Sequence, residues 1–249
     1  MVKKAEKIEK KDVLELNTDQ MALAGLHFGH RTSKIHPKIK PYLSGERNGV
    51  NIIDLEKTKE KLQEALKFIG DLISENKILI LIGTKIQIKD LLKRTAEECA
   101  LPYVSERWLG GTFTNFNTIL KRTDYYKNLE RQKETGELEK YTKKERAKFD
   151  QELKNLEIKF GGIKNLIKLP DAIFVCDMKK DKLAVKEAKM KGIKVIGISD
   201  TNIDPTQADF PIPANDDAVT SVGYILEKIK ETILKAKSEI KVIKPETAK

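Results

Sequence analysis

Runs of apolar residues and apolar residues at helical spacing follow one another along this chain, and they predict strands and helices in turn. Residues 78–82 are apolar at every position, which is the pattern of a parallel strand buried on both faces of its sheet. The segment before this run carries apolar residues at the spacing of one helix face, namely Leu55, Leu62, Leu66, Ile69 and Ile73. The first half of the chain therefore alternates between strand and helix.

The alternation continues through the second half. We expect further strands at residues 50–55, 102–104, 169–177, 193–198 and 210–213. We expect helices at residues 88–99, around 184–188, from Asn215 or Asp216 to Ile233, and between Thr18, as the cap, and Gly25. Strands separated by helices favour an α/β fold, with a doubly wound parallel sheet in a three-layer α/β/α sandwich.

A long charged segment interrupts this alternation between residues 114 and 160. Gly136, a residue that commonly ends helices, separates two stretches that each have apolar residues at helical spacing. Thr142 and Glu145 have the spacing of a capping box and start the second stretch. Its apolar residues follow at intervals of four, three and four, at Phe149, Leu153, Leu156 and Phe160. We predict an antiparallel coiled-coil hairpin inserted into the α/β domain.

The charge of the chain favours a polyanionic partner. Lys and Arg number 48 against 38 Asp and Glu, which gives a net charge of +10 and an isoelectric point near 9.3. The charged N-terminal segment lacks the apolar stretch of a secretory signal, and no apolar run approaches the ~20 residues that span a bilayer. Cys99 and Cys176 give neither metal-ligand spacing nor a disulfide framework. We therefore expect a soluble protein of the cytoplasm.

Residues 25–42 contain all the histidines of the chain, His27, His30 and His36. Two prolines and two glycines favour an ordered loop over a helix in this segment. No Cys or carboxylate lies near the histidines in sequence, which disfavours a metal site. Basic residues interleaved with imidazoles and a tyrosine favour an RNA-contacting loop instead. The basic residues of this loop and its continuation are Arg31, Lys34, Lys38, Lys40 and Arg47.

Several charged side chains directly follow predicted strands. In a parallel sheet the loops beyond the carboxyl ends of the strands meet at one edge. We therefore expect Asp54, Lys85, Arg107, Asp177 and Asp200 to share that edge. The segment around Lys85 lacks the earlier glycine of a P-loop, and no nucleophile with an adjacent base is apparent. We expect no catalytic residue and no cofactor.

An alternative hypothesis is an enzyme that uses a metal ion at an acidic edge of the sheet. Asp177, Asp200 and Asp204 would supply the carboxylates. Asp and Asn also stabilise turns without any metal, through hydrogen bonds to the turn backbone. Whether the turn at residues 200–204 or the histidine-containing loop binds a metal stays open at this point.

Residues 107–116 combine features of a turn with features of a binding loop. They contain the only tryptophan, Trp108, which we expect to pack beneath the turn. Gly110 and Gly111 allow a sharp change of direction or a close approach to a partner. Arg107, Thr112 and Asn115 are candidates for contacts with RNA phosphate or sugar.

Nine motifs in a fixed order carry a resemblance to a known family. They are Gly25-Leu26-His27-Phe28-Gly29-His30, Pro37-Lys38, Arg47-Asn48-Gly49, Ile52-Ile53-Asp54-Leu55, Gly83-Thr84-Lys85, Arg107-Trp108-Leu109-Gly110-Gly111-Thr112, Leu169-Pro170-Asp171, Asp200-Thr201-Asn202 and Pro213-Ala214-Asn215-Asp216-Asp217-Ala218. The chain closely resembles the S2 family of small-subunit ribosomal proteins in its bacterial form. The resemblance runs from about residue 12 to residue 235.

This resemblance implies a structural protein that binds small-subunit ribosomal RNA and supports translation. It implies a flavodoxin-like sandwich with a coiled-coil insertion, and a location on the ribosome in the cytoplasm. The implied partners are this RNA and neighbouring small-subunit proteins, including the mRNA-binding first protein, whose docking it would support.

The predicted domain organisation follows from these patterns. We expect a charged N-terminal tail (residues 1–17), a sandwich domain (residues 18–113 and 161–236), an inserted hairpin (residues 114–160) and a basic C-terminal tail (residues 237–249). The residues expected to bind RNA are Arg31, Lys34, Lys38, Lys40, Arg47, Lys85, Arg107, Thr112 and Asn115.

Overall fold

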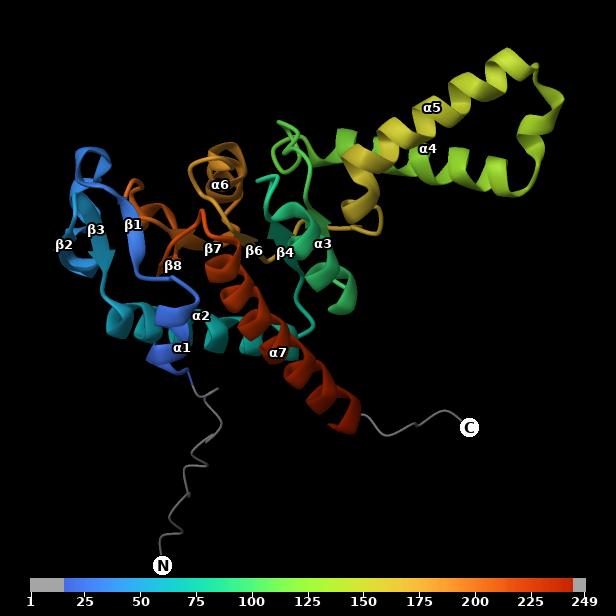
Figure 1. The fold of residues 1–249 in the computed structure, drawn as a ribbon. Coiled ribbons are helices and arrows are strands. Elements are labelled where there is room, and N and C mark those ends of the chain that lie inside the picture. Colours follow the sequence, from blue (N-terminus) through green and yellow to red (C-terminus); the bar gives the residue numbers. More distant parts are fainter. Residues whose placement is uncertain (1–15, 244–249) are drawn as a thin grey trace, which may run out of the picture.

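A five-stranded sheet with helices on both faces forms the body of the protein, and a smaller sheet adjoins one end of it (Figure 1). This computed structural model describes residues 16–243. The predicted N-terminal tail lies outside the described residues except for its last two positions, and so do residues 244–249 of the predicted C-terminal tail. Residues 237–243 of that tail instead continue the last helix, α7 (Val219–Ile243).

The strands of the main sheet are all parallel. In their spatial order they are β5 (Tyr103–Val104), β4 (Leu79–Ile82), β6 (Ala172–Val175), β7 (Lys194–Ser199) and β8 (Phe210–Pro213). The two central strands, β4 and β6, are buried at every position, as their uninterrupted apolar sequences predict. The expected α/β fold with a parallel sheet is therefore confirmed.

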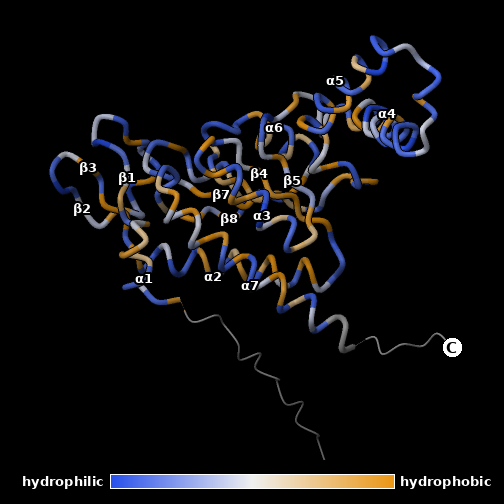
Figure 2. Tube along the Cα trace, turned by 45° about the vertical axis from the view of Figure 1, so that its right-hand side comes forward, coloured by the Kyte–Doolittle hydropathy of each residue, from blue (hydrophilic) through white to orange (hydrophobic). Residues whose placement is uncertain are grey.

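Successive side chains of each strand point to opposite faces of the sheet, and each face has its own apolar core. In β4, Leu79 and Leu81 pack with helices α2 (Leu55–Ser74), α3 (Lys89–Glu98) and α7. Ile80 and Ile82 pack on the other face with α6 (Lys182–Met190). Figure 2 shows the hydrophobic residues gathered in the layers between these helices and the sheet. None of the described helices is long and apolar enough to span a membrane.

The strand expected at residues 50–55 does not belong to the parallel sheet. It forms β3 (Val50–Ile53), the centre of an antiparallel sheet with β1 (Phe28–Arg31) and β2 (Leu43–Arg47) on either side. Asn48 and Gly49 between β2 and β3 both have positive φ, at 52° and 73°. An Asn-Gly pair with this conformation makes a tight hairpin turn, and such a turn connects antiparallel strands only.

The segment expected to be an ordered loop contains regular structure. Besides β1 it forms two short 3₁₀ helices, η1 (Thr32–Lys34) and η2 (Pro37–Tyr42). The helix before it, α1 (Thr18–Leu23), is capped by Asn17 rather than by Thr18, because the Asn17 side chain accepts a hydrogen bond from the Asp19 amide at 2.7 Å. Asn caps helices as well as Thr does, and the observed cap lies one residue before the expected one.

Helices α4 (Phe116–Glu134) and α5 (Lys143–Phe160) extend away from the body and pack against each other (Figure 1). The helix η3 (Glu137–Lys140) connects them, and the capping box of Thr142 and Glu145 starts α5 as predicted. Their buried side chains belong to the same apolar core as β4 and α6. The pair is therefore joined to the body by continuous packing as well as by the chain.

The short helix η4 (Gly161–Ile163) fixes the base of α5 against the edge strand β5. A Cβ atom at Gly162 would lie 2.2 Å from the carbonyl oxygen of Tyr103, whereas one at Gly161 would meet only the Glu157 side chain at 3.6 Å. The backbone at Gly162 therefore approaches β5 more closely than any other residue type allows.

We predict that Gly162→Ala lowers the free energy of unfolding by about 1–3 kcal/mol, as overpacking of a close contact does. Gly161→Ala is the matched control and should change it by less than about 1 kcal/mol, because its added methyl has room. Urea unfolding followed by circular dichroism measures both. Equal stability of the two variants would contradict the close approach.

Candidate functional site

Lys85 lies at the carboxyl edge of the parallel sheet and is surrounded by carboxylates. Its Nζ is 2.9 Å from Oδ2 of Asp177, which follows β6, and 2.8 Å from Oδ1 of both Asp216 and Asp217, which precede α7. The Lys85 side chain is only 15% exposed. Burial alone would lower the pKa of Lys85, but the hydrogen bonds to these carboxylates raise it. Lys85 is thus the shared cation of an acidic cluster.

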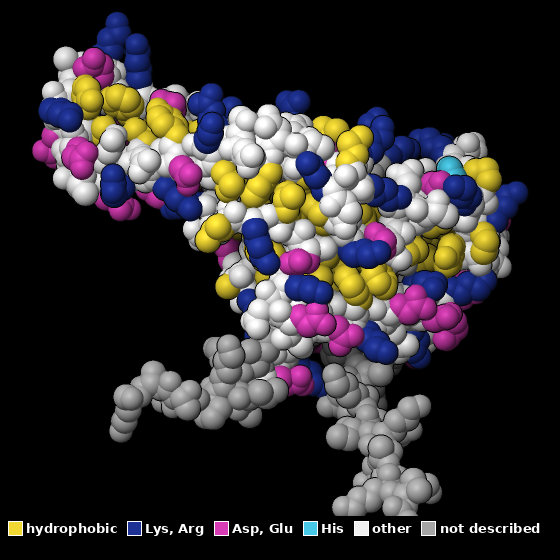
Figure 3. Space-filling model, turned by 180° about the vertical axis from the view of Figure 1, so that it is seen from behind, with side chains coloured by type: hydrophobic (Ala, Val, Ile, Leu, Met, Phe, Trp, Pro, Cys, Tyr) yellow, Lys and Arg dark blue, Asp and Glu magenta, His cyan; other side chains and the backbone are white. Residues whose placement is uncertain are grey.

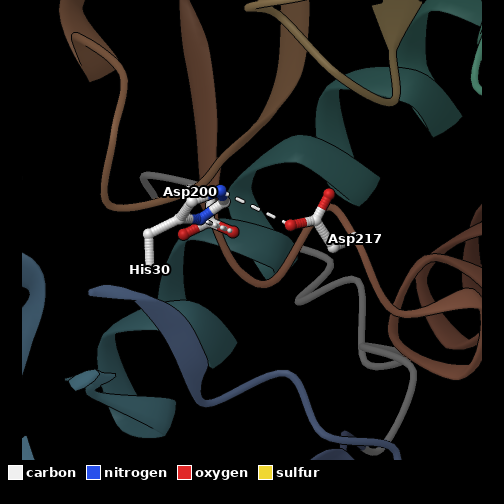
Figure 4. A group of neighbouring side chains, drawn as sticks. All are labelled: His30, Asp200 and Asp217. Atoms are coloured by element: carbon white, nitrogen blue, oxygen red, sulfur yellow. Dashed lines mark ion pairs between the residues drawn. The ribbon is translucent and has the colours of Figure 1, made fainter. Parts of the chain in front are cut away.

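His30 joins the same edge from the small sheet. Its Nδ1 is 3.1 Å from Oδ2 of Asp200, and its Nε2 is 3.4 Å from Oδ2 of Asp217 (Figure 4). The hydrogen bond with Asp200 raises the pKa of His30, because the imidazolium can donate to the carboxylate. His30, Asp200 and Asp217 each offer a ligand atom within 4.8 Å of the others, so a neutral imidazole and two carboxylates are placed where a divalent cation could be held.

The acidic edge contains more buried carboxylates than the sequence predicted. Burial, with repulsion from Asp200 and Asp177, raises the pKa of Asp216 to about 7. Asp181 is also buried and accepts hydrogen bonds from the amide and the hydroxyl of Thr84, at 3.3 and 2.8 Å. The ion pairs with Asp177, Asp216 and Asp217 leave Lys85 little freedom to reach a surface ligand.

The residues expected to share this edge are only partly brought together. Lys85 and Asp177 form an ion pair, and Asp200 accepts a hydrogen bond from the amide of Asp216 at 3.4 Å. Asp54 instead follows a strand of the small sheet and caps α2, where it accepts a hydrogen bond from the Glu56 amide.

The acids of the enzyme hypothesis do not converge on one point either. Asp177 binds Lys85, and Asp200 binds His30. Asp204 binds Lys38 at 2.7 Å and caps η5 (Pro205–Gln207). Of these three, only Asp200 belongs to the group with cation-binding geometry.

One buried carboxylate organises the loop at residues 107–116. Glu187 of α6 is 4% exposed and accepts hydrogen bonds from the amides of Gly111, Phe113 and Thr114, at 2.8, 2.9 and 3.2 Å. It also accepts one from the Trp108 indole at 3.3 Å. Burial alone would raise the pKa of Glu187, but these donors lower it below its ordinary value. The prediction that Trp108 packs beneath the turn is confirmed, since it is 6% exposed.

The candidate RNA-binding residues of this loop differ in their exposure to solvent. Arg107 and Asn115 are exposed. Thr112 is buried, and its hydroxyl donates to the carbonyl oxygen of Leu109 at 2.6 Å. The Thr112 side chain therefore stabilises the turn and does not face the surrounding solution.

The basic residues of the N-terminal segment are exposed together. Arg31, Lys34, Lys38, Lys40 and Arg47 all have exposed side chains, and we call residues 31–47 the basic loop. Only Lys38 among these five has an ion-pair partner among the described residues. Figure 3 shows Lys and Arg side chains along the upper edge of the molecule, whereas basic and acidic side chains are mixed over the faces below. The basic loop thus has cationic groups available to a ligand.

Sequence reasoning missed Glu187, Asp181, Asp216 and Asp217 as site residues. Glu187 lies in a lysine-rich segment, and this composition predicts an exposed, solvated side chain. A usable signal was its position, because it falls between Val185 and Ala188 on the apolar face of α6. A charged residue on that face must be compensated inside the protein.

We predict that Lys85→Met lowers the free energy of unfolding by about 3–5 kcal/mol, because it leaves buried carboxylates without their cation. Lys89→Met is the matched control. It removes an exposed ion pair with Glu106 and should cost about 0–1 kcal/mol. Urea unfolding compares the two, and similar losses would show that the Lys85 cluster does not stabilise the edge.

We predict that Glu187→Ala costs about 3 kcal/mol or more, because several buried donors lose their acceptor. The folded-state pKa of Glu187 is lowered, so its contribution is fully present above the unfolded value near pH 4.3 and is lost as the pH falls through the folded value. The difference from the unmodified protein should therefore shrink below about pH 4.

Urea unfolding over a pH series tests this, with fluorescence of the single tryptophan as a local probe. The emission of Trp108 should shift to longer wavelength in Glu187→Ala. The exposed Met190, on the same helix, provides the control Met190→Ala. Equal stability and equal emission of the two variants would refute a role for Glu187 in holding the loop.

Comparisons with known proteins identify the family. The sequence profile of the family described as Ribosomal protein S2 matches residues 21–236. The small ribosomal subunit protein uS2 of Dehalococcoides mccartyi is 40% identical over 231 residues, which cover 93% of this chain and 94% of that protein. The protein of the same name from Coprothermobacter proteolyticus is 44% identical over 218 residues, which cover 88% and 81% of the two chains. This chain therefore belongs to the ribosomal protein S2 family, whose members are structural, non-enzymatic proteins of the small ribosomal subunit.

Proposed function

We propose that the protein binds small-subunit ribosomal RNA and that the basic loop supplies a principal contact. The observation that carries the proposal is the group of exposed cations at Arg31, Lys34, Lys40 and Arg47, none of which has an ion-pair partner among the described residues. Unpaired Lys and Arg side chains bind phosphate by releasing its counterions. Arg107 and Asn115 are exposed at the loop held by Glu187 and extend the proposed contact.

Two residues expected to bind RNA have positioning roles in this proposal instead. Lys85 is held by buried carboxylates, and Thr112 is buried within its own turn. Both stabilise the loops from which exposed residues reach the RNA. The proposed direct contacts are therefore Arg31, Lys34, Lys38, Lys40, Arg47, Arg107 and Asn115.

We also propose that the fold is flavodoxin-like and that α4 and α5 form an inserted coiled-coil hairpin. Counted in chain order, the five strands of the main sheet lie in the order 2-1-3-4-5, which is the flavodoxin-like arrangement. Leu153, Leu156 and Phe160 are buried on one side of α5, as the spacing of a coiled coil requires.

The proposed partners include neighbouring small-subunit proteins and the mRNA-binding first protein. The extension of α4 and α5 away from the body supports this part, because it gives a surface that a large partner can reach (Figure 1). Membership of a non-enzymatic family removes the metal-dependent enzyme at Asp177, Asp200 and Asp204 from consideration. The location that follows is the ribosome in the cytoplasm.

We predict that the triple variant Arg31→Ala, Lys34→Ala, Lys40→Ala binds purified small-subunit ribosomal RNA more weakly. Each lost phosphate contact should flatten the slope of log K against log salt by about 0.7–0.9. The three changes together should flatten it by up to roughly 2–3. Lys38 is left intact because its ion pair with Asp204 contributes to the structure.

Filter binding over a salt series measures both quantities. A charge-matched control replaces Lys59, Lys67 and Arg94 by Ala. These residues lie on α2 and α3. The control should keep most of the affinity and slope. If the basic-loop variant keeps the slope of the unmodified protein, the basic loop does not contact RNA.

A further inference from the structure

The exposed charged side chains of α6 and of the turns on either side of it are all lysines. Seven lysines between residues 179 and 194 have exposed side chains, at Lys179, Lys180, Lys182, Lys186, Lys189, Lys191 and Lys194. The two acids of this segment, Asp181 and Glu187, are both buried and hydrogen-bonded to other parts of the protein. The outer surface of the segment therefore carries positive charge without the intermixed acids found on the other helices.

Three of these lysines form a stripe along one side of the helix. Lys182, Lys186 and Lys189 are spaced i, i+4 and i+7, which places them on one face over about 10 Å of helix. The opposite face packs into the core through Ala184, Val185 and Ala188, among others. We call the three lysines the α6 stripe.

The charges of the α6 stripe are not neutralised within the protein. Lys182 and Lys186 have no hydrogen-bond or ion-pair partner among residues 16–243. Lys189 donates to the carbonyl oxygen of Thr206 at 3.2 Å, which leaves its charge unpaired. Asp209 lies near Lys189, but its ion pair is with Lys194 at 2.8 Å. Burial alone would raise the pKa of Asp209, whereas the hydrogen bond from Lys194 and, to a smaller extent, the charge of Lys189 lower it.

The α6 stripe is continuous with the basic loop. Thr206 of η5 receives both a hydrogen bond from Lys189, on its carbonyl oxygen, and one from Lys38 of the basic loop, on its hydroxyl, each at 3.2 Å. A small hollow opens beside this junction, and its polar lining is Lys189, Lys194, Thr206 and Asp209. The two basic surfaces therefore meet at one residue.

We infer that the α6 stripe is a second contact surface for the phosphate backbone of small-subunit ribosomal RNA, joined to the basic loop through Thr206. A row of unpaired ammonium groups on flexible stems matches a polyanion that is longer than one phosphate. Lysine is depleted at protein–protein interfaces, so RNA fits this surface better than an acidic protein does. The inference rests on the proposed RNA-binding function and adds a surface to it.

The test is a salt series of filter binding with the full chain and purified small-subunit ribosomal RNA. The variant Lys182→Gln, Lys186→Gln, Lys189→Gln should bind more weakly and flatten the slope of log K against log salt by up to roughly 2–3. Lys182→Gln, Lys186→Gln keeps the contact with Thr206 and should give about two thirds of that change. The control Lys59→Gln, Lys67→Gln, Arg94→Gln removes the same charge from α2 and α3, and an unchanged Tm shows that each variant is folded.

Two results would overturn the inference. One is an α6-stripe variant with the affinity and slope of the unmodified protein. The other is an equal loss in the control, which would make net charge alone responsible. If the basic-loop variant weakens binding in the same series while the α6-stripe variant does not, only this inference fails. If the unmodified protein does not bind the RNA at all, the proposed function fails with it.

Discussion

Compensation of buried carboxylates at the carboxyl edge of the parallel sheet is the constraint on which the rest of the structure depends. Asp177, Asp200 and Asp216 are each at most 5% exposed, and an uncompensated charge in such a place costs several kcal/mol. His30 pairs with Asp200, and Lys85 compensates Asp177 and Asp216 from the end of β4. Because its partners follow β6 and precede α7, one ammonium group connects two strands and the start of the last helix.

The same edge attaches the small sheet to the body. The amide of His30 donates to the hydroxyl of Thr201, and the amide of His36 donates to the carbonyl oxygen of the same residue, both at 2.8 Å. A Cβ atom at Gly29 would lie 2.4 Å from the Thr201 methyl, so only glycine permits this approach. The basic loop that continues from β1 is therefore held at a fixed place beside the main sheet.

In the segment around α6 the acidic side chains are buried and the basic ones are exposed. The acids of α6 and of the turn before it point inward. Glu187 accepts a hydrogen bond from the indole of Trp108, and Asp181 accepts one from the hydroxyl of Thr84. Lysines of the same segments point outward. A net charge of +10 over 249 residues is moderate, yet it produces strongly basic surfaces because the compensating acids are withdrawn from them. Local charge at a surface, rather than total charge, is what an RNA backbone meets.

The sequence by itself determined the elements of the body and their class. Uninterrupted apolar runs predicted β4 and β6, helical spacing predicted α2, and the capping box predicted the start of α5, because each pattern depends on residues that are close in the chain. The positive charge of the basic loop also follows directly from its amino-acid sequence. The Asn-Gly pair at residues 48–49 is a local signal for the antiparallel hairpin, although the strand that follows it was expected in the parallel sheet.

Only the tertiary structure decided which charged residues face the solution and which face each other. His30 and Asp200 are 170 positions apart, yet their side chains are within 3.1 Å, and Lys85 meets Asp216 across 131 positions. No local pattern encodes such pairs. Lys85 meets Asp216 because the ends of parallel strands share one edge, and His30 meets Asp200 because the small sheet packs beside that edge. For the same reason the sequence could not tell that Lys85 and Thr112 are enclosed while Arg31 and Lys186 remain free for a ligand.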